Sequence, residues 1–118
     1  MIVGIGIDVV DIKRVSEKLG NRILSSKEFE IWQKRKKMEF VAGRFALKEA
    51  FFKAIGTGIR GVDLKSISFV PDESGALHLE ENEVILSLKK IYEFDLVHVS
   101  LSHDGDIAAA VVLIERKT

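Results

Sequence analysis

The sequence predicts a single α+β domain in which a small, largely antiparallel sheet packs with helices. Its 118 residues are enough for one compact domain, so residues 1–118 are expected to form one unit. The apolar pattern switches between a helical period of about 3.6 residues and a strand period of about two. Turn-forming residues at 72–75 and 104–106 each stand between two strand-like segments. Helices and strands in this order favour an α+β arrangement.

The first third of the chain is expected to hold one strand and two short helices. Residues 2–7 are apolar and rich in β-branched side chains, which indicates a buried strand. Asp11 is a suitable N-cap for a first helix, which Gly20 would end. Residues 25–28, Ser-Ser-Lys-Glu, match a capping box, so a second helix is expected from there to about Arg35.

A long helix is expected in the middle of the chain, from about Met38 to Ile55. Residues 35–37 are basic and are interpreted as an exposed break in front of it. The helix is apolar on nearly all sides, so it should be largely buried. It runs into a glycine-rich loop at 56–61, Gly-Thr-Gly-Ile-Arg-Gly.

The second half of the chain is expected to contain four strands and one helix. Asn82 would cap a helix that reaches about Tyr92, with Val84, Leu88 and Ile91 on one face. The turn at 72–75 would close a hairpin. The expected strands are 66–70, 76–79, 96–101 and 107–114.

Composition excludes several classes of protein. Hydrophobic residues make up 47% of the chain, too many for intrinsic disorder, and the absence of cysteine excludes a disulfide framework or thiolate-ligated metal. No apolar run approaches the roughly 20 residues of a membrane span. The opening residues lack the basic flank of a signal peptide. We therefore expect a cytoplasmic protein that does not associate with a membrane.

The charges are unevenly distributed, although the net charge is zero. Residues 13–60 hold 13 basic and 5 acidic side chains, whereas residues 61–118 hold 5 basic and 11 acidic ones. The zero total argues against bulk binding to nucleic acid. The basic segment indicates an anionic ligand or an acidic partner. The alternative is an ordinary solvated Lys/Glu helix surface.

Four charged side chains lie between the apolar stripes of the long helix and need partners if the helix is buried. Glu49 and Lys53 stand four residues apart and can pair with each other. Arg44 and Lys48 have the same spacing but the same sign, so they would repel each other unless an anion lies between them. A phosphate would suit that place.

Asp8, which follows an apolar segment, is a second candidate for chemistry. It could cap the next turn, which is the ordinary role of such a residue. It could instead meet Glu49 around one hard cation, with water filling the other positions, as suits Mg²⁺ bound together with a phosphorylated substrate. The loop at 56–61 could cradle a phosphate with its backbone N–H groups, although glycine after a helix is also the usual C-cap.

The run Ser102-His103-Asp104 does not indicate a hydrolase. A catalytic triad is assembled in space, and neighbouring residues of a strand point to opposite faces. His103 could bind an anion or polarise a hydroxyl, and a structural role is an equal alternative.

Four stretches of the sequence match one known family in the same order. They are Gly6-Ile7-Asp8, the segment 43–54 (GRFALKEAFFKA), Gly56-Thr57-Gly58, and the segment 100–104 (SLSHD). With them the sequence resembles the holo-[acyl-carrier-protein] synthases, the short bacterial 4′-phosphopantetheinyl transferases. The resemblance covers essentially the whole chain, and the long middle motif is highly specific.

The resemblance implies a fold, a reaction and a partner. The fold would be that of the 4′-phosphopantetheinyl transferases. The family moves the phosphopantetheine arm of coenzyme A to a serine hydroxyl of apo acyl carrier protein, for fatty acid biosynthesis, and releases adenosine 3′,5′-bisphosphate. It is typically a homotrimer with active sites between subunits.

The resemblance also implies the site residues. Asp8 and Glu49 would hold Mg²⁺ against the coenzyme A diphosphate. Glu49, or a water bound to the metal, would accept the serine proton, and Lys48 would neutralise or protonate the departing phosphate. The residues implied to line the nucleotide and phosphate site are Arg44, Lys48, Lys53, Gly56, Gly58 and His103.

A basic surface after the first strand is expected to bind the acidic carrier protein. Its candidate residues are Lys13, Arg14, Lys18 and Arg22. The alternative for each is an ordinary solvated side chain.

Two other functions fit parts of the sequence. One is a non-catalytic module that binds coenzyme A or a nucleotide through Arg44, Lys48 and Lys53. The other is an RNA-binding domain that uses residues 13–60, against which stands the lack of an exposed aromatic platform for stacking bases. We expect no nucleic-acid partner.

Overall fold

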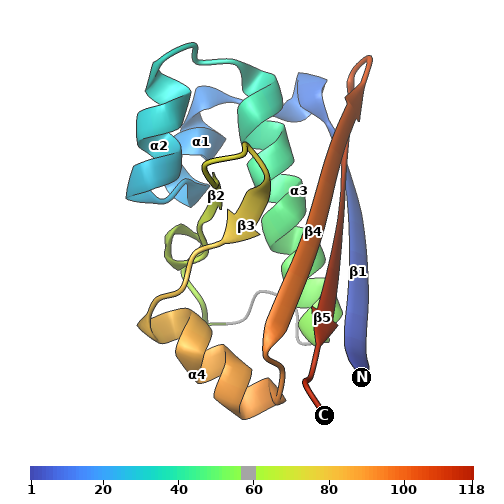
Figure 1. The fold of residues 1–118 in the computed structure, drawn as a ribbon. Helices are drawn as coiled ribbons and strands as arrows, with labels where there is room; N and C mark the ends of the chain where they lie inside the picture. Colours follow the sequence, from blue (N-terminus) through green and yellow to red (C-terminus); the bar gives the residue numbers. More distant parts are fainter. Residues whose placement is uncertain (57–60) are drawn as a thin grey trace.

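The computed structural model of the chain describes residues 1–56 and 61–118, and it confirms the expected α+β class (Figure 1). A three-stranded antiparallel sheet lies along one side of the long helix α3. Two short helices lie beside one end of α3, and α4 lies near the other end. The helices are η1 (Ile12–Arg14), α1 (Glu17–Ile23), α2 (Ser26–Gln33), α3 (Met38–Ile55), η2 (Leu64–Ser66) and α4 (Glu83–Tyr92), where η marks a 3-10 helix.

The larger sheet has the strand order β1-β5-β4. It consists of β1 (Ile2–Asp11), β4 (Leu96–Asp104) and β5 (Ile107–Glu115), and β5 pairs antiparallel with both neighbours. The register sets Asp8 beside Ala110 and His103 beside Ala108. A separate hairpin pairs β2 (Phe69–Pro71) with β3 (Leu77–Leu79).

The long helix α3 forms the centre of the main core, with the bounds that the sequence predicts. Gly56 ends it in the left-handed region at φ 91°, and its N–H donates to the Phe52 carbonyl. Phe51 makes edge-to-face contacts with Phe52, Phe69 and Phe94. The sheet contributes the inward side chains of β5 to this core: Ala110, Val112 and Ile114.

Two glycines bring β1 unusually close to α3. A Cβ built on Gly6 would lie 2.0 Å from the Ala50 carbonyl oxygen, and one on Gly4 would lie 2.0 Å from that of Ala54. Since a real Cβ never approaches backbone this closely, only glycine permits this packing. The close approach places Asp8, two residues after Gly6, beside the last turns of α3.

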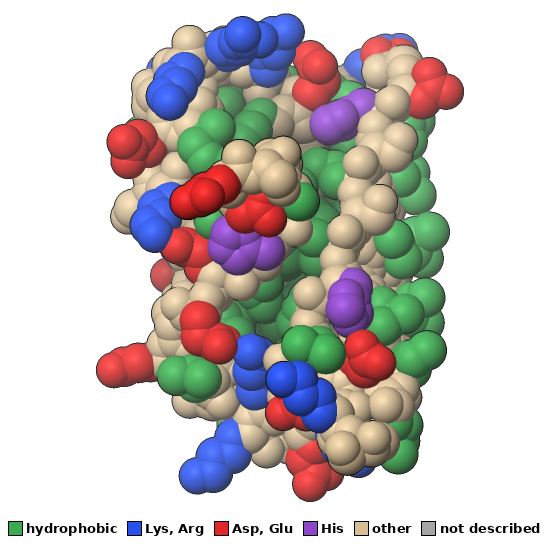
Figure 2. Space-filling model, in the orientation of Figure 1, with side chains coloured by type: hydrophobic (Ala, Val, Ile, Leu, Met, Phe, Trp, Pro, Cys, Tyr) green, Lys and Arg blue, Asp and Glu red, His purple; other side chains and the backbone are tan. Residues whose placement is uncertain are grey.

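The expectation that the first strand is buried is wrong. β1 is an edge strand, and Ile5, Ile7 and Val9 are 64%, 62% and 58% exposed on the sheet face opposite α3. In the register they lie next to Leu113, Val111 and Ala109 of β5. We call these six residues, which are the apolar part of this face, the outer sheet face. Figure 2 shows hydrophobic side chains projecting along this edge of the molecule.

Other expectations about the first half also need correction. Asp11 caps η1, not a longer helix, and Ser16 caps α1. Gly20 lies inside α1, where a Cβ would stand 3.1 Å from atoms of Trp32 and Val41, so close packing explains this glycine. The capping box of Ser25 and Glu28 is confirmed.

The second half follows the prediction more closely. The turn at 72–75 and the Asn82 cap of α4 are confirmed. The strand expected at 66–70 is shorter, because η2 includes Ser66 and β2 starts at Phe69. Ile91, expected on the same face of α4 as Leu88, is 66% exposed, and Ile85 and Leu88 are the buried residues of that helix. Among the described residues, no helix combines the length and hydropathy needed to cross a bilayer.

Candidate active site

Asp8, Glu49 and Lys53 meet where β1 passes α3. Lys53 Nζ lies 3.0 Å from Asp8 Oδ1 and also donates to the Ile7 carbonyl at 3.1 Å. The Asp8 side chain is 16% exposed and that of Lys53 is 54% exposed. The sequence suggested that Lys53 pairs with Glu49 one turn earlier on the helix. The ammonium instead pairs with the carboxylate on the neighbouring strand.

Glu49 is close enough to Asp8 for the two carboxylates to influence each other. Partial burial raises the pKa of Glu49, the negative charge of Asp8 raises it further, and Lys53 lowers it. Two neighbouring carboxylates repel each other when both are ionised, and a cation bound between them would relieve this repulsion. The residues therefore fit a hard divalent ion with oxygen ligands, such as Mg²⁺. Within residues 1–56 and 61–118, no group of three or more acidic or imidazole side chains forms a fuller metal cage, so water or substrate oxygens would complete the shell.

Both carboxylates line one open cavity of about 480 Å³. Arg14 and Asp11 lie on its rim, and Phe45 and Val15 contribute apolar wall. A site between β1, η1 and α3 thus offers two anionic oxygen donors, a lysine and a surface large enough for part of an organic substrate.

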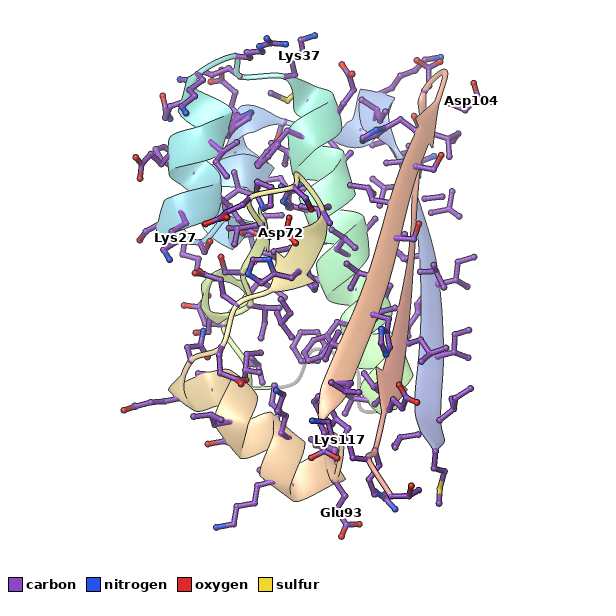
Figure 3. All side chains as sticks on the ribbon, in the orientation of Figure 1. Lys27, Lys37, Asp72, Glu93, Asp104 and Lys117 are labelled. Atoms are coloured by element: carbon purple, nitrogen blue, oxygen red, sulfur yellow. The ribbon has the colours of Figure 1, made fainter. Side chains whose placement is uncertain are left out.

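A second cavity, of about 330 Å³, contains Arg44 and His103. The Arg44 guanidinium stacks 4.2 Å over the Phe40 ring, and His103 Nε2 lies 3.3 Å from the Glu39 carbonyl oxygen. Gly43 makes room for His103, since a Cβ there would stand 3.3 Å from Nε2. Four consecutive basic residues, Lys34, Arg35, Lys36 and Lys37, line the same cavity. We call it the basic cavity; Figure 3 labels Lys37 at its edge, at the start of α3.

The two cavities share no lining residue. Five of the sequence-predicted site residues therefore divide into two groups within one chain. Asp8, Glu49 and Lys53 form one group, and Arg44 and His103 form the other. The sequence gives no sign of the basic cavity, because the basic residues 35–37 are equally typical of an exposed break before a helix.

Lys48 does not face either cavity. Its side chain is completely buried, and Nζ donates to Glu28 Oε1 at 2.5 Å, to the Ile23 carbonyl at 2.5 Å and to the Leu64 carbonyl at 3.0 Å. The expectation that Arg44 and Lys48 hold an external anion between them is thus wrong. The anion is the Glu28 carboxylate, which also lies 3.9 Å from Arg44 Nε. Burial lowers the pKa of both basic groups, and Glu28 opposes that shift.

Comparison with known proteins connects this geometry to a family. Residues 4–112 match the family model described as "4'-phosphopantetheinyl transferase superfamily". The chain belongs to this superfamily. It is 48% identical, over 99% of its own length and 66% of the relative, to a holo-[acyl-carrier-protein] synthase of Thermotoga maritima. It is 41% identical to that of a Geobacillus species, over 98% of both chains.

Solved structures agree with this membership. The crystal structure of the holo-[acyl-carrier-protein] synthase from Neisseria meningitidis matches with a TM-score of 0.90 and 33% identity, over 98% of this chain and all of that one. The Bacillus anthracis synthase, solved in complex with coenzyme A (3′,5′-ADP), matches with a TM-score of 0.81 and 37% identity, over 99% of each chain. The fold expected from the resemblance is therefore confirmed.

The predicted carrier-binding residues lie on the surface of this transferase-family chain. Arg14 lines the cavity of Asp8 and Glu49, and its Nε lies 3.9 Å from Asp11. Lys13 pairs with Asp106 at 3.1 Å, and Lys18 and Arg22 are exposed one turn apart on α1. Of the predicted glycines, Gly56 caps α3, and Gly58 lies outside the described residues.

Proposed function

We propose that the chain transfers the 4′-phosphopantetheine group of coenzyme A to a serine hydroxyl of an apo acyl carrier protein, in fatty acid biosynthesis. The observation that carries the proposal is that Asp8 and Glu49 line one cavity together with Arg14, while Lys53 pairs with Asp8. The names of the similar proteins support the same reaction. A cytoplasmic location is part of the proposal.

In the reaction, the serine oxygen forms a bond to the β-phosphorus of coenzyme A, and the bond from that phosphorus to the bridging oxygen breaks. The serine proton passes to Glu49, directly or through a water, and adenosine 3′,5′-bisphosphate leaves. Glu49 is assigned this role because its carboxylate lines the cavity beside Asp8. In such transfers the protein mainly positions reactants and neutralises charge.

Asp8 and Glu49 would hold Mg²⁺ in this scheme. When bound, the ion would supply positive charge to the diphosphate oxygens. Lys53 would supply a second positive charge at the departing phosphate. We assign that task to Lys53 and not to Lys48, because Lys53 is half exposed and pairs with Asp8, whereas all three N–H donors of Lys48 are used inside the protein.

The basic cavity would receive another anionic part of coenzyme A. Arg44 and His103 line it, and its apolar wall includes Phe40 and Trp32. Because it shares no lining residue with the cavity of Asp8 and Glu49, a substrate could reach both most directly where two copies of the chain meet. The outer sheet face, with three exposed β-branched side chains on β1, would supply the contact between copies in a homotrimer.

The carrier protein would approach the basic surface formed by Lys13, Arg14, Lys18 and Arg22. Arg14 is the best placed of these residues, since it lies on the rim of the cavity of Asp8 and Glu49. A basic rim would steer an acidic partner and orient its serine toward Glu49.

Mass spectrometry of apo acyl carrier protein incubated with the enzyme, coenzyme A and Mg²⁺ tests the proposal. We expect the carrier to gain one phosphopantetheine, and a chelator to abolish the gain. A non-catalytic module that binds coenzyme A would give binding in calorimetry without Mg²⁺ dependence and no gain in mass. Such a result would replace the proposed function with that alternative.

A further inference from the structure

Glu28 is a buried carboxylate that no step of the proposed reaction uses. It lies in the first turn of α2, and its side chain is fully buried. A charged group in this position is costly unless its partners compensate for the lost water. The arrangement of those partners indicates what it does.

The two oxygens of Glu28 bind different elements of the fold. Oε1 accepts hydrogen bonds from the Ser25 N–H at 2.9 Å and from Lys48 Nζ at 2.5 Å. Oε2 accepts one from the Phe69 N–H at 2.9 Å and lies 3.9 Å from Arg44 Nε. One carboxylate therefore joins the start of α2, the middle of α3 and the first residue of β2.

Arg44 is held by the same group of residues. Its Nε donates to the Phe69 carbonyl at 3.0 Å, while the Phe69 N–H donates to Glu28. Phe40 covers its guanidinium at 4.2 Å, and Arg44 lines the basic cavity although it is only 6% exposed. The guanidinium is thus fixed before any ligand arrives, and a planar donor group benefits most from such fixing.

We propose that Glu28 is a positioning residue, which fixes the guanidinium of Arg44 in the wall of the basic cavity so that it can bind an anion. Glu28 also neutralises Lys48, which stands one turn after Arg44 and would otherwise repel it. The inference rests on the proposed function, in which this cavity receives an anionic part of coenzyme A. Glu28 itself does not touch the ligand.

A double-mutant cycle between Glu28 and Arg44 tests this role. The measurement is the Kd of coenzyme A by calorimetry for the wild type, Glu28→Gln, Arg44→Gln and the double variant. We expect Glu28→Gln to weaken binding about tenfold when Arg44 is present and to have no further effect when Arg44 is absent. In steady-state assays the loss should fall mainly on the KM for coenzyme A. Equal losses in both backgrounds, or no loss at all, would overturn the positioning role.

Two further variants keep the test decisive. Glu80→Gln is the matched control, because Glu80 pairs with Lys27, also on α2, and lines neither cavity of the site. It should leave the Kd unchanged. If Glu28→Gln does not fold, Glu28→Gln/Lys48→Met removes both buried charges together, which proteins tolerate better than one unpaired charge. This pair should show the same tenfold loss, and wild-type affinity in it would refute the proposal.

The cycle also separates this inference from the proposed function. A wild-type protein that does not bind coenzyme A would overturn both. A wild-type protein that binds it, together with an unaltered Kd in the folded Glu28 variants, would overturn only the positioning role.

Discussion

Lys53 Nζ lies 3.0 Å from Asp8 Oδ1, although the two residues are 45 positions apart in the chain. The last turns of α3 carry the lysine, and β1 carries the carboxylate. Glu49 stands one turn before Lys53 and has a raised pKa because of its partial burial and the nearby Asp8. The candidate site is therefore a small cluster in which two acids share a single ammonium, a balance that several substitutions can test.

The substitution Lys53→Met tests the role of the ammonium. Since Lys53 lowers the pKa of Glu49, its removal should raise that pKa further. It also removes the positive charge assigned to the departing phosphate, so we expect turnover to fall about 100-fold. A carbon-detected NMR titration of the Glu49 carboxyl and a transfer assay give the two readouts. Lys90→Met, on α4, is the control and should change neither. A Glu49 titration that is the same with and without Lys53 would contradict the assignment.

The raised pKa of Glu49 predicts a specific dependence of stability on pH. In the folded protein Glu49 holds its proton up to a higher pH than in the unfolded chain. Its contribution to the free energy of unfolding therefore falls as pH rises between those two pKa values. At a pH above both pKa values, Glu49→Gln should be more stable than the wild type, and below both it should be equally stable. The expected difference in Tm is only about 1–3 °C, because water screens a partly exposed group. Thermal melts across pH would show this; a variant less stable at neutral pH would contradict the sign.

Gly6→Ala tests whether close packing of β1 on α3 builds the site. The new Cβ would meet the Ala50 carbonyl oxygen at 2.0 Å, so the strand must move away from the helix. We expect a loss of about 3 kcal/mol in the free energy of unfolding, from overpacking, and a further loss of activity in the molecules that fold. Denaturant unfolding measures the first effect. Gly75→Ala, where a Cβ meets open space but φ is 90°, should cost only about 1 kcal/mol. Equal costs would show that the close approach is unimportant.

Ile7→Lys tests the outer sheet face as a contact between copies of the chain. Ile7 is 62% exposed on β1, and Ile91, 66% exposed on α4, offers a matched control. A lysine at position 7 should prevent assembly and greatly reduce transfer activity while circular dichroism stays unchanged. A lysine at position 91 should do neither. Sedimentation velocity distinguishes the species, and a trimer that survives Ile7→Lys would assign the contact to another face.

The parts of the fold that local sequence rules determine were predictable. Helix α3 has the expected bounds, and Asn82 caps α4 as expected, because a long apolar run and a capping side chain act locally. The exposure of β1 was not predictable, since an apolar strand looks the same whether both of its faces or only one is covered within the chain. The role of Gly20 was not predictable either, because glycine occurs both at helix ends and inside helices. Its reason here is the close packing of Trp32 and Val41, which the sequence does not show.

The candidate site was predictable in part for similar reasons. The positions of Asp8 and Glu49 were expected to converge, and the structure brings them to one cavity. The sequence also indicated that Arg44 and Lys48 need an anion between them, but it did not indicate that this anion is the Glu28 carboxylate. The capping box placed Glu28 at the start of α2 and gave no sign that its side chain reaches Lys48, because that contact depends on how α2 packs on α3.

Binding of Mn²⁺, a paramagnetic substitute for Mg²⁺, tests the central claim most directly. Electron paramagnetic resonance would follow Mn²⁺ titrated into the protein saturated with coenzyme A. If Asp8 and Glu49 hold the ion, the wild type should bind one Mn²⁺ per chain, and Asp8→Asn and Glu49→Gln should each lose this binding while they remain folded. Unchanged Mn²⁺ binding in either folded variant would contradict the claim that these two carboxylates form the metal site.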